Sequence, residues 1–141
     1  MKIPEELTYA RNFKGVSEIF KDKWVVVQEN LEQQTIIHCV AKADSQFFKR
    51  QNLNISPKTY LVNREKIPGI VPIDQAIDIP VLPKRLSKKQ TITELRFTLI
   101  FGAVPSNWRW FTLIEERKDK NGIEIARINK NQTGSYTIIL P

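Results

Sequence analysis

The amino-acid sequence predicts a single all-β domain, or a β-rich domain with one or two short helices, folded as an antiparallel barrel or sandwich. Two observations lead to this class. The chain has 141 residues, of which 41% are hydrophobic and 26% charged, so one domain with a buried core is expected over residues 1–141. Short runs of β-branched and aromatic residues recur between polar turns, which favours short strands over long helices.

The first part of the chain, residues 1–66, is expected to contain short strands and one short helix. Asp44 is a suitable N-cap for a helix that continues to Arg50. The β-branched and aromatic content of three further runs predicts strands, at 23–28 (KWVVVQ), 35–41 (TIIHCVA) and 59–63 (TYLVN).

The connection that follows, residues 67–90, is proline-rich and then basic, and it is expected to be extended. Its four prolines each remove a backbone N–H and fix φ, which argues against a central strand: Pro68, Pro72, Pro80 and Pro83. A flexible linker would be polar, whereas this segment is apolar. The apolar side chains either pack on the sheet or form a docking surface for a partner protein: Ile70, Val71, Ile73, Ile77, Ile79, Val81 and Leu82.

The last part, residues 91–140, is expected to be an antiparallel meander of four sequential strands. Asn121-Gly122 predicts a tight hairpin turn, because both residue types tolerate positive φ. The strands are predicted at 91–104, 108–116, 123–128 and 135–140.

The charge and cysteine content suggest a cytoplasmic protein. The formal net charge is +7, which favours anionic partners but also suits solubility. Cys39 is the single cysteine, so the chain forms no internal disulfide. The N-terminus shows no apolar signal region, and the longest apolar run, 99–105, is too short to span a membrane.

No constellation of catalytic or metal-ligating residues stands out, so we expect no cofactor, no metal and no enzyme activity. His38 and Cys39 are adjacent on a predicted strand, so their side chains should point to opposite faces. Glu116, Arg117 and Lys118 resemble a nuclease pattern only if an upstream carboxylate joins them, and the candidates are Asp74, Asp78 and Glu94.

The favoured function is a non-catalytic binding module that holds DNA or RNA on a basic, aromatic-bearing β surface. The candidate binding residues are Lys84, Arg85, Lys88, Lys89, Trp108, Arg109 and Trp110. Trp108 and Trp110 would serve either as a stacking platform or as core side chains. Two alternatives stay open: a protein-interaction or assembly subunit, including a homo-oligomer, that docks through residues 67–83, and a small-molecule site in a barrel mouth.

Overall fold

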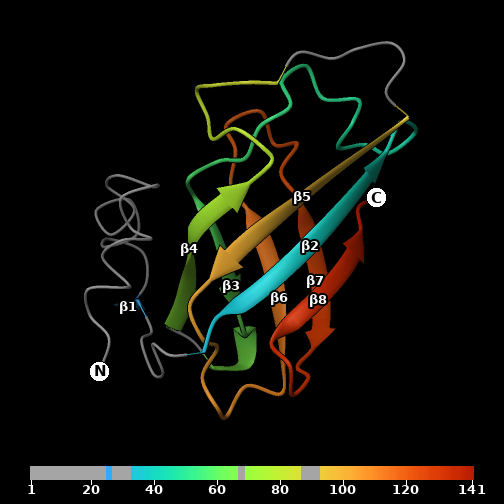
Figure 1. The fold of residues 1–141 in the computed structure, drawn as a ribbon. Coiled ribbons are helices and arrows are strands. Elements are labelled where there is room, and N and C mark those ends of the chain that lie inside the picture. Colours follow the sequence, from blue (N-terminus) through green and yellow to red (C-terminus); the bar gives the residue numbers. More distant parts are fainter. Residues whose placement is uncertain (1–24, 27–32, 67–68, 87–92) are drawn as a thin grey trace.

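The computed structural model describes residues 25–26, 33–66, 69–86 and 93–141, and these residues form one curled, mixed β-sheet (Figure 1). The sheet curls into a half-barrel, which confirms the predicted barrel-like all-β class. The strands are β1 (Val25–Val26), β2 (Thr35–Lys42), β3 (Thr59–Val62), β4 (Gly69–Ile77), β5 (Glu94–Phe101), β6 (Trp110–Glu115), β7 (Glu124–Asn129) and β8 (Ser135–Ile139).

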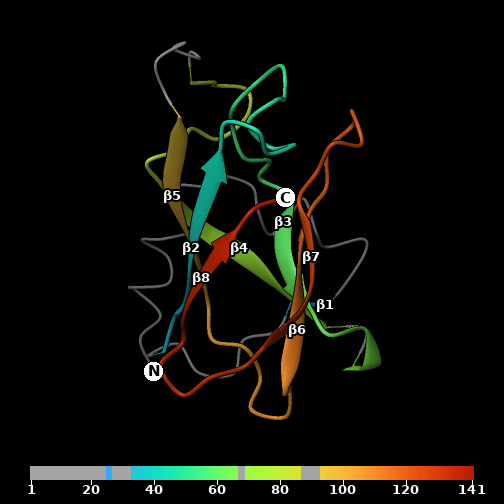
Figure 2. The same cartoon turned by 90° about the vertical axis from the view of Figure 1, so that its right-hand side faces the viewer.

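The strands follow the order β7-β6-β3-β4-β5-β2-β8, and β1 pairs with β4 outside this path. Figure 2 shows two layers, with β3, β6 and β7 on one side and β2, β5 and β8 on the other. Strand β4 crosses from one layer to the other and belongs to both. The curl of the sheet therefore depends on this strand.

The central position of β4 corrects the prediction that prolines exclude a central strand from this segment. The first half of β4 pairs with β3 and ends at Pro72, which lies opposite Tyr60. Pairing with β5 begins only at Ile73, and a bulge follows between Ile73 and Gln75. Because Pro72 lies where β4 exchanges one partner for the other, its missing N–H does not interrupt the ladder with β5.

The predicted C-terminal meander is only partly correct. The hairpin of β6 and β7 is confirmed, with Trp110 opposite Asn129 and Ile114 opposite Glu124. Strands β3 and β4, however, lie between β5 and β6. Strand β8 crosses to the far edge of the sheet and pairs in parallel with β2, so the sheet is mixed rather than antiparallel. Turn signals identify neighbours along the chain but not this long-range pairing.

The helix predicted from Asp44 is wrong, because residues 43–50 form successive turns. Ser45 is the residue that caps them, since its hydroxyl accepts from the Phe48 N–H at 3.1 Å. The N–H groups of Gln46 and Phe47 donate to the carbonyl of Pro141 instead of closing a helical turn. Within the described ranges, the helical structure is one 3₁₀ turn at Arg64–Lys66.

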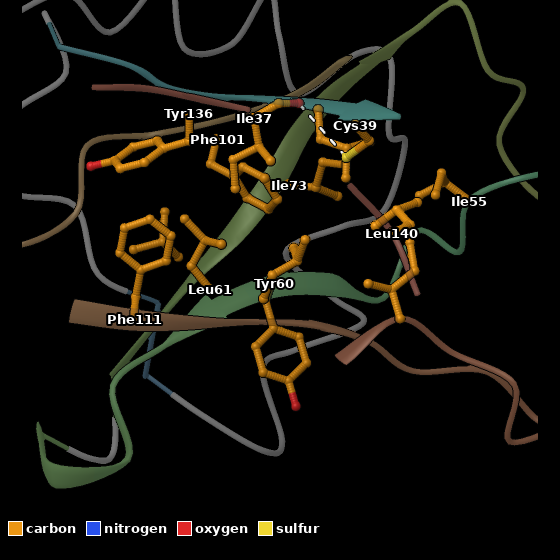
Figure 3. Close-up of a cluster of buried hydrophobic side chains, with 14 of the residues drawn as sticks. Ile37, Cys39, Ile55, Tyr60, Leu61, Ile73, Phe101, Phe111, Tyr136 and Leu140 are labelled. Carbon is orange, nitrogen blue, oxygen red and sulfur yellow. Dashed lines mark hydrogen bonds between the residues drawn. The ribbon is translucent and has the colours of Figure 1, made fainter. Parts of the chain in front are cut away.

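The core lies between the two layers (Figure 3). Phe101 and Leu61 are fully buried and approach from opposite layers, and Ile73 of β4 lies near the junction. The rings of Phe111 and Tyr136 meet edge to face with 5.3 Å between centroids, which links β6 to β8 across the interior.

The loops gather at the two ends of the half-barrel, because β2, β4, β6 and β8 run one way while β3, β5 and β7 run the other. The hairpin end, at the top of Figure 1, comprises the loops 43–58, 78–86 and 116–123. The tryptophan end, at the bottom, comprises 63–66, 102–109 and 130–134.

Candidate functional site

A buried network of three charged side chains lies at the hairpin end. Alternation along β6 directs Glu115 to the same face as Phe111 and Leu113, and its side chain is 0% exposed. Arg50 pairs with Glu115 at 2.5 Å and Arg117 pairs with it at 3.2 Å. Removing three charges from water is costly unless each is paired, so these residues depend on one another.

Backbone N–H groups complete the shell of the Glu115 carboxylate. Ser56 N donates to Oε2 at 2.9 Å and Ile123 N donates to Oε1 at 3.1 Å. Asn54 accepts from Arg117 Nη1 at 2.8 Å through its side-chain oxygen, and its Nδ2 donates to the carbonyl of Lys84. The carboxylate therefore ties together the loops 43–58 and 116–123, and Asn54 joins the loop 78–86 to them.

Gly122 fits this network because of a close approach. A Cβ at this position would lie 1.8 Å from the carbonyl oxygen of Glu115. The positive φ that the hairpin requires occurs instead at Lys120, where φ is 62°. The Asn121-Gly122 signal thus identified the hairpin correctly, but the physical reason for glycine is the close packing of the returning strand.

A cavity of about 530 Å³ opens beside the network, within the size range of small-molecule sites. Arg117, whose side chain is only 4% exposed, forms part of its wall. The complete lining is Asn52, Ser56, Pro57, Lys58, Leu82, Glu116, Arg117, Lys118 and Asp119. We call this site the hairpin pocket. The sequence analysis does not predict it.

The acidic and basic groups of the hairpin pocket differ in how fully they are engaged. Asp119 accepts from Asn121 N at 3.0 Å and from Arg117 Nε at 3.4 Å, and these contacts lower the pKa of its carboxyl. Glu116 also has an interaction partner within the chain.

The cations of the pocket keep donors available. The ammonium groups of Lys58 and Lys118 make no hydrogen bond or ion pair with any described residue. Arg117 uses Nε and Nη1 for its bonds, so within the described part of the chain its Nη2 stays available. The hairpin pocket therefore presents positive charge that its own carboxylates do not neutralise.

Part of the predicted basic run lies next to this pocket. Lys84 and Arg85 are exposed at the hairpin end, and Arg85 donates to the side chain of the pocket residue Asn52 at 3.2 Å. Lys88 and Lys89 lie outside the described residues.

The predicted aromatic partners of this run lie at the other end of the half-barrel. Trp108 is 2% exposed and belongs to the core, so it cannot form a stacking platform. Trp110 is half-buried under the guanidinium of Arg127, 4.8 Å from its ring, and Arg109 is exposed. The structure thus separates the basic and aromatic halves of the predicted nucleic-acid surface.

The apolar segment proposed for docking mostly fills the core. Four of its residues are at most 6% exposed: Ile70, Val71, Ile73 and Ile79. Val81 is half-buried, while Ile77 and Leu82 are 38% and 43% exposed. These positions do not form the contiguous apolar surface that a docking partner would need.

His38 and Cys39 point to opposite faces of β2, as predicted. His38 is exposed and its Nδ1 lies 3.0 Å from Thr98 Oγ1. Burial, with a smaller effect of the Glu115 charge, raises the pKa of the Cys39 thiol to about 12, which keeps it protonated and unreactive. Among the described residues, no cluster of three or more His, Cys, Asp or Glu side chains is placed to hold a metal ion.

Comparison with known proteins adds no family. No protein-family model matches this chain, and comparisons with curated proteins and with solved structures gave no match. In the described ranges, no helix has the length and apolar character needed to cross a membrane. The functional argument therefore rests on the chemistry of the hairpin pocket.

Proposed function

We propose that this domain is a non-catalytic binding module that takes an anionic organic molecule in the hairpin pocket. The observation that carries the proposal is the difference between the bonded carboxylate of Asp119 and the available cations around one cavity. Asp119 is bonded to Arg117 and to the backbone, whereas the ammonium groups of Lys58 and Lys118 are not paired with described residues. An anion that enters the pocket supplies the missing counter-charge.

Preorganisation supports the same reading. Arg117 is fixed by Asn54, Glu115 and Asp119, so its guanidinium does not lose further freedom when a ligand binds. The backbone of Lys58 is also held, because its N–H donates to the Ser56 hydroxyl and its carbonyl accepts from Glu116 N. The pocket is therefore largely formed before any ligand arrives.

A titration with sodium phosphate at constant ionic strength, followed by backbone amide NMR shifts, tests the proposal. Shifts should concentrate in residues 52–58 and 116–119. The double variant Lys58→Ala/Lys118→Ala should bind at least about tenfold more weakly, since a hydrogen bond to a charged group contributes roughly 1.5–3 kcal/mol.

The matched control is Lys120→Asn, which removes one charge from the same loop at a residue outside the pocket lining. Asparagine tolerates the positive φ of this position, so the loop should keep its shape. Equal binding by the wild type and the double variant, or no shifts at all, would contradict the proposed function.

Nucleic-acid binding is a second candidate, favoured by the position of Lys84 and Arg85 beside the pocket. Their exposed charges would extend the pocket's positive field along a phosphate backbone. The same titration with a single-stranded oligonucleotide separates the two candidates. If nucleic acid is the ligand, Lys84→Ala/Arg85→Ala should lower the affinity for the oligonucleotide and leave the affinity for inorganic phosphate unchanged.

A further inference from the structure

One wall of the hairpin pocket is apolar and exposed. Leu82 is 43% exposed, and of the three large exposed hydrophobic side chains in the described residues it alone lines this cavity. Its place is fixed, because Leu82 N donates to Ile55 O at 2.9 Å and Ile55 N donates to Pro80 O at 3.0 Å. The half-buried ring of Pro57 lines the same pocket. An apolar group seated there would remove this surface from water.

The charged wall suits a dianion better than a monoanion. Lys58, Lys118 and Arg117 Nη2 offer three separate sets of donors. A phosphate monoester carries a charge of about −1.5 to −2 at pH 7 and three strong acceptor oxygens. A carboxylate carries a single negative charge and two oxygens, so it leaves one cation without a counter-charge.

From these two walls we infer that the ligand is a phosphate monoester with an apolar body. Its phosphate lies against Lys58, Lys118 and Arg117, and its body covers Leu82 and Pro57. The inference rests on the proposed function and adds the chemical class of the ligand. Side chains hold the phosphate, which agrees with the absence of a glycine-rich phosphate loop from the sequence.

Isothermal titration with four probes tests the inference: phenyl phosphate, inorganic phosphate, benzoate and benzyl alcohol. Phenyl phosphate should bind roughly tenfold more tightly than inorganic phosphate, which corresponds to partial burial of one ring. Benzoate should bind more weakly than phenyl phosphate by about tenfold, because it lacks one charge and one acceptor oxygen. Benzyl alcohol should not bind measurably.

Two variants locate the apolar wall. Leu82→Ala should reduce the affinity for phenyl phosphate several-fold and leave that for inorganic phosphate unchanged. Ile77→Ala is the matched control, since Ile77 is comparably exposed but lies outside the pocket lining. It should alter neither affinity.

The outcomes separate this inference from the proposed function. Equal affinity for phenyl phosphate and inorganic phosphate would contradict the inference that the ligand has an apolar body. Equal affinity for benzoate and phenyl phosphate would contradict the inference that its anionic group is a phosphate. In both cases anion binding itself would stand. If none of the three anions binds, both the inference and the proposed function fail.

Discussion

At the hairpin end, Arg50, Glu115 and Arg117 are buried against one another, whereas the tryptophan end buries aromatic and apolar side chains. Trp108 is packed into the core there, and its backbone N–H donates to Pro105 O at 3.0 Å in a tight turn. Apolar burial stabilises a fold without directional demands. A buried ion network contributes little net stability but fixes orientation strictly, which suits a site that must present charge.

The comparison suggests a division of roles between the two ends. At the tryptophan end, Asn63 Nδ2 donates to Trp110 O and Lys130 N donates to Arg109 O, so side chains and backbone close that end. At the hairpin end the hydrogen bonds from Ser56 and Ile123 to Glu115 lie beside an open cavity. We expect substitutions at the tryptophan end to act on stability and substitutions at the hairpin end to act on binding as well.

The largest effect is expected from Glu115→Gln. The variant leaves Arg50 buried without its counter-charge and Arg117 with only the half-exposed Asp119, and the new amide group faces arginine donors. The free energy of unfolding, measured with urea, should fall by about 3–5 kcal/mol. Glu94→Gln is the control, because Glu94 pairs with an Arg96 side chain that is 71% exposed. That variant should cost at most about 1 kcal/mol, and equal losses would show that burial of the Glu115 network does not make its ion pairs more important than an exposed pair.

Substitutions of the two tryptophans test the comparison between the two ends from the tryptophan end. Trp108→Ala removes a buried ring and should lower the free energy of unfolding by about 3–5 kcal/mol. Trp110→Ala loses the contact with Arg127 at a half-buried site and should cost about 1 kcal/mol. Neither should change phosphate affinity once the protein is folded. Weaker phosphate binding by folded Trp110→Ala would show that the ends are coupled.

Local features of the fold could be predicted from the sequence, while long-range ones could not. The β6–β7 hairpin and the strands β2 and β3 followed from turn residues and β-branched runs. The pairing of β8 with β2 joins residues about one hundred positions apart in the chain, and no local pattern specifies it. Strand β4 could not be predicted, because proline as a residue type argues against a central strand. Only the tertiary structure shows that β4 changes its pairing partner at Pro72, which makes proline acceptable there.

The candidate site shows the same limit. The alternation that puts Glu115 on the same strand face as Phe111 and Leu113 is the sequence signal for a buried carboxylate here. Its partner Arg50 lies 65 residues earlier, in a segment predicted to be a helix. The pocket itself is made by three loops that only the tertiary structure brings together.

The smallest expected effect concerns Asp119, which joins the pocket wall to Arg117. The backbone hydrogen bond from Asn121 and the Arg117 charge lower its pKa in the folded protein. A lowered folded pKa adds stability that is present above the unfolded value, about 3.9, and is lost as the pH falls through the folded value.

Asp119→Asn keeps an oxygen for Asn121 but removes the charge. Because the carboxyl is half exposed, the loss at pH 6 should be a few tenths of a kcal/mol, and it should be smaller at pH 3, where part of the carboxyl is protonated. Urea midpoints of both proteins at the two pH values measure this difference. A stability difference between the two proteins that is unchanged at pH 3 would mean that Asp119 acts through loop geometry rather than charge. Electrostatic interactions would then contribute less to the order of the hairpin pocket than its buried network implies.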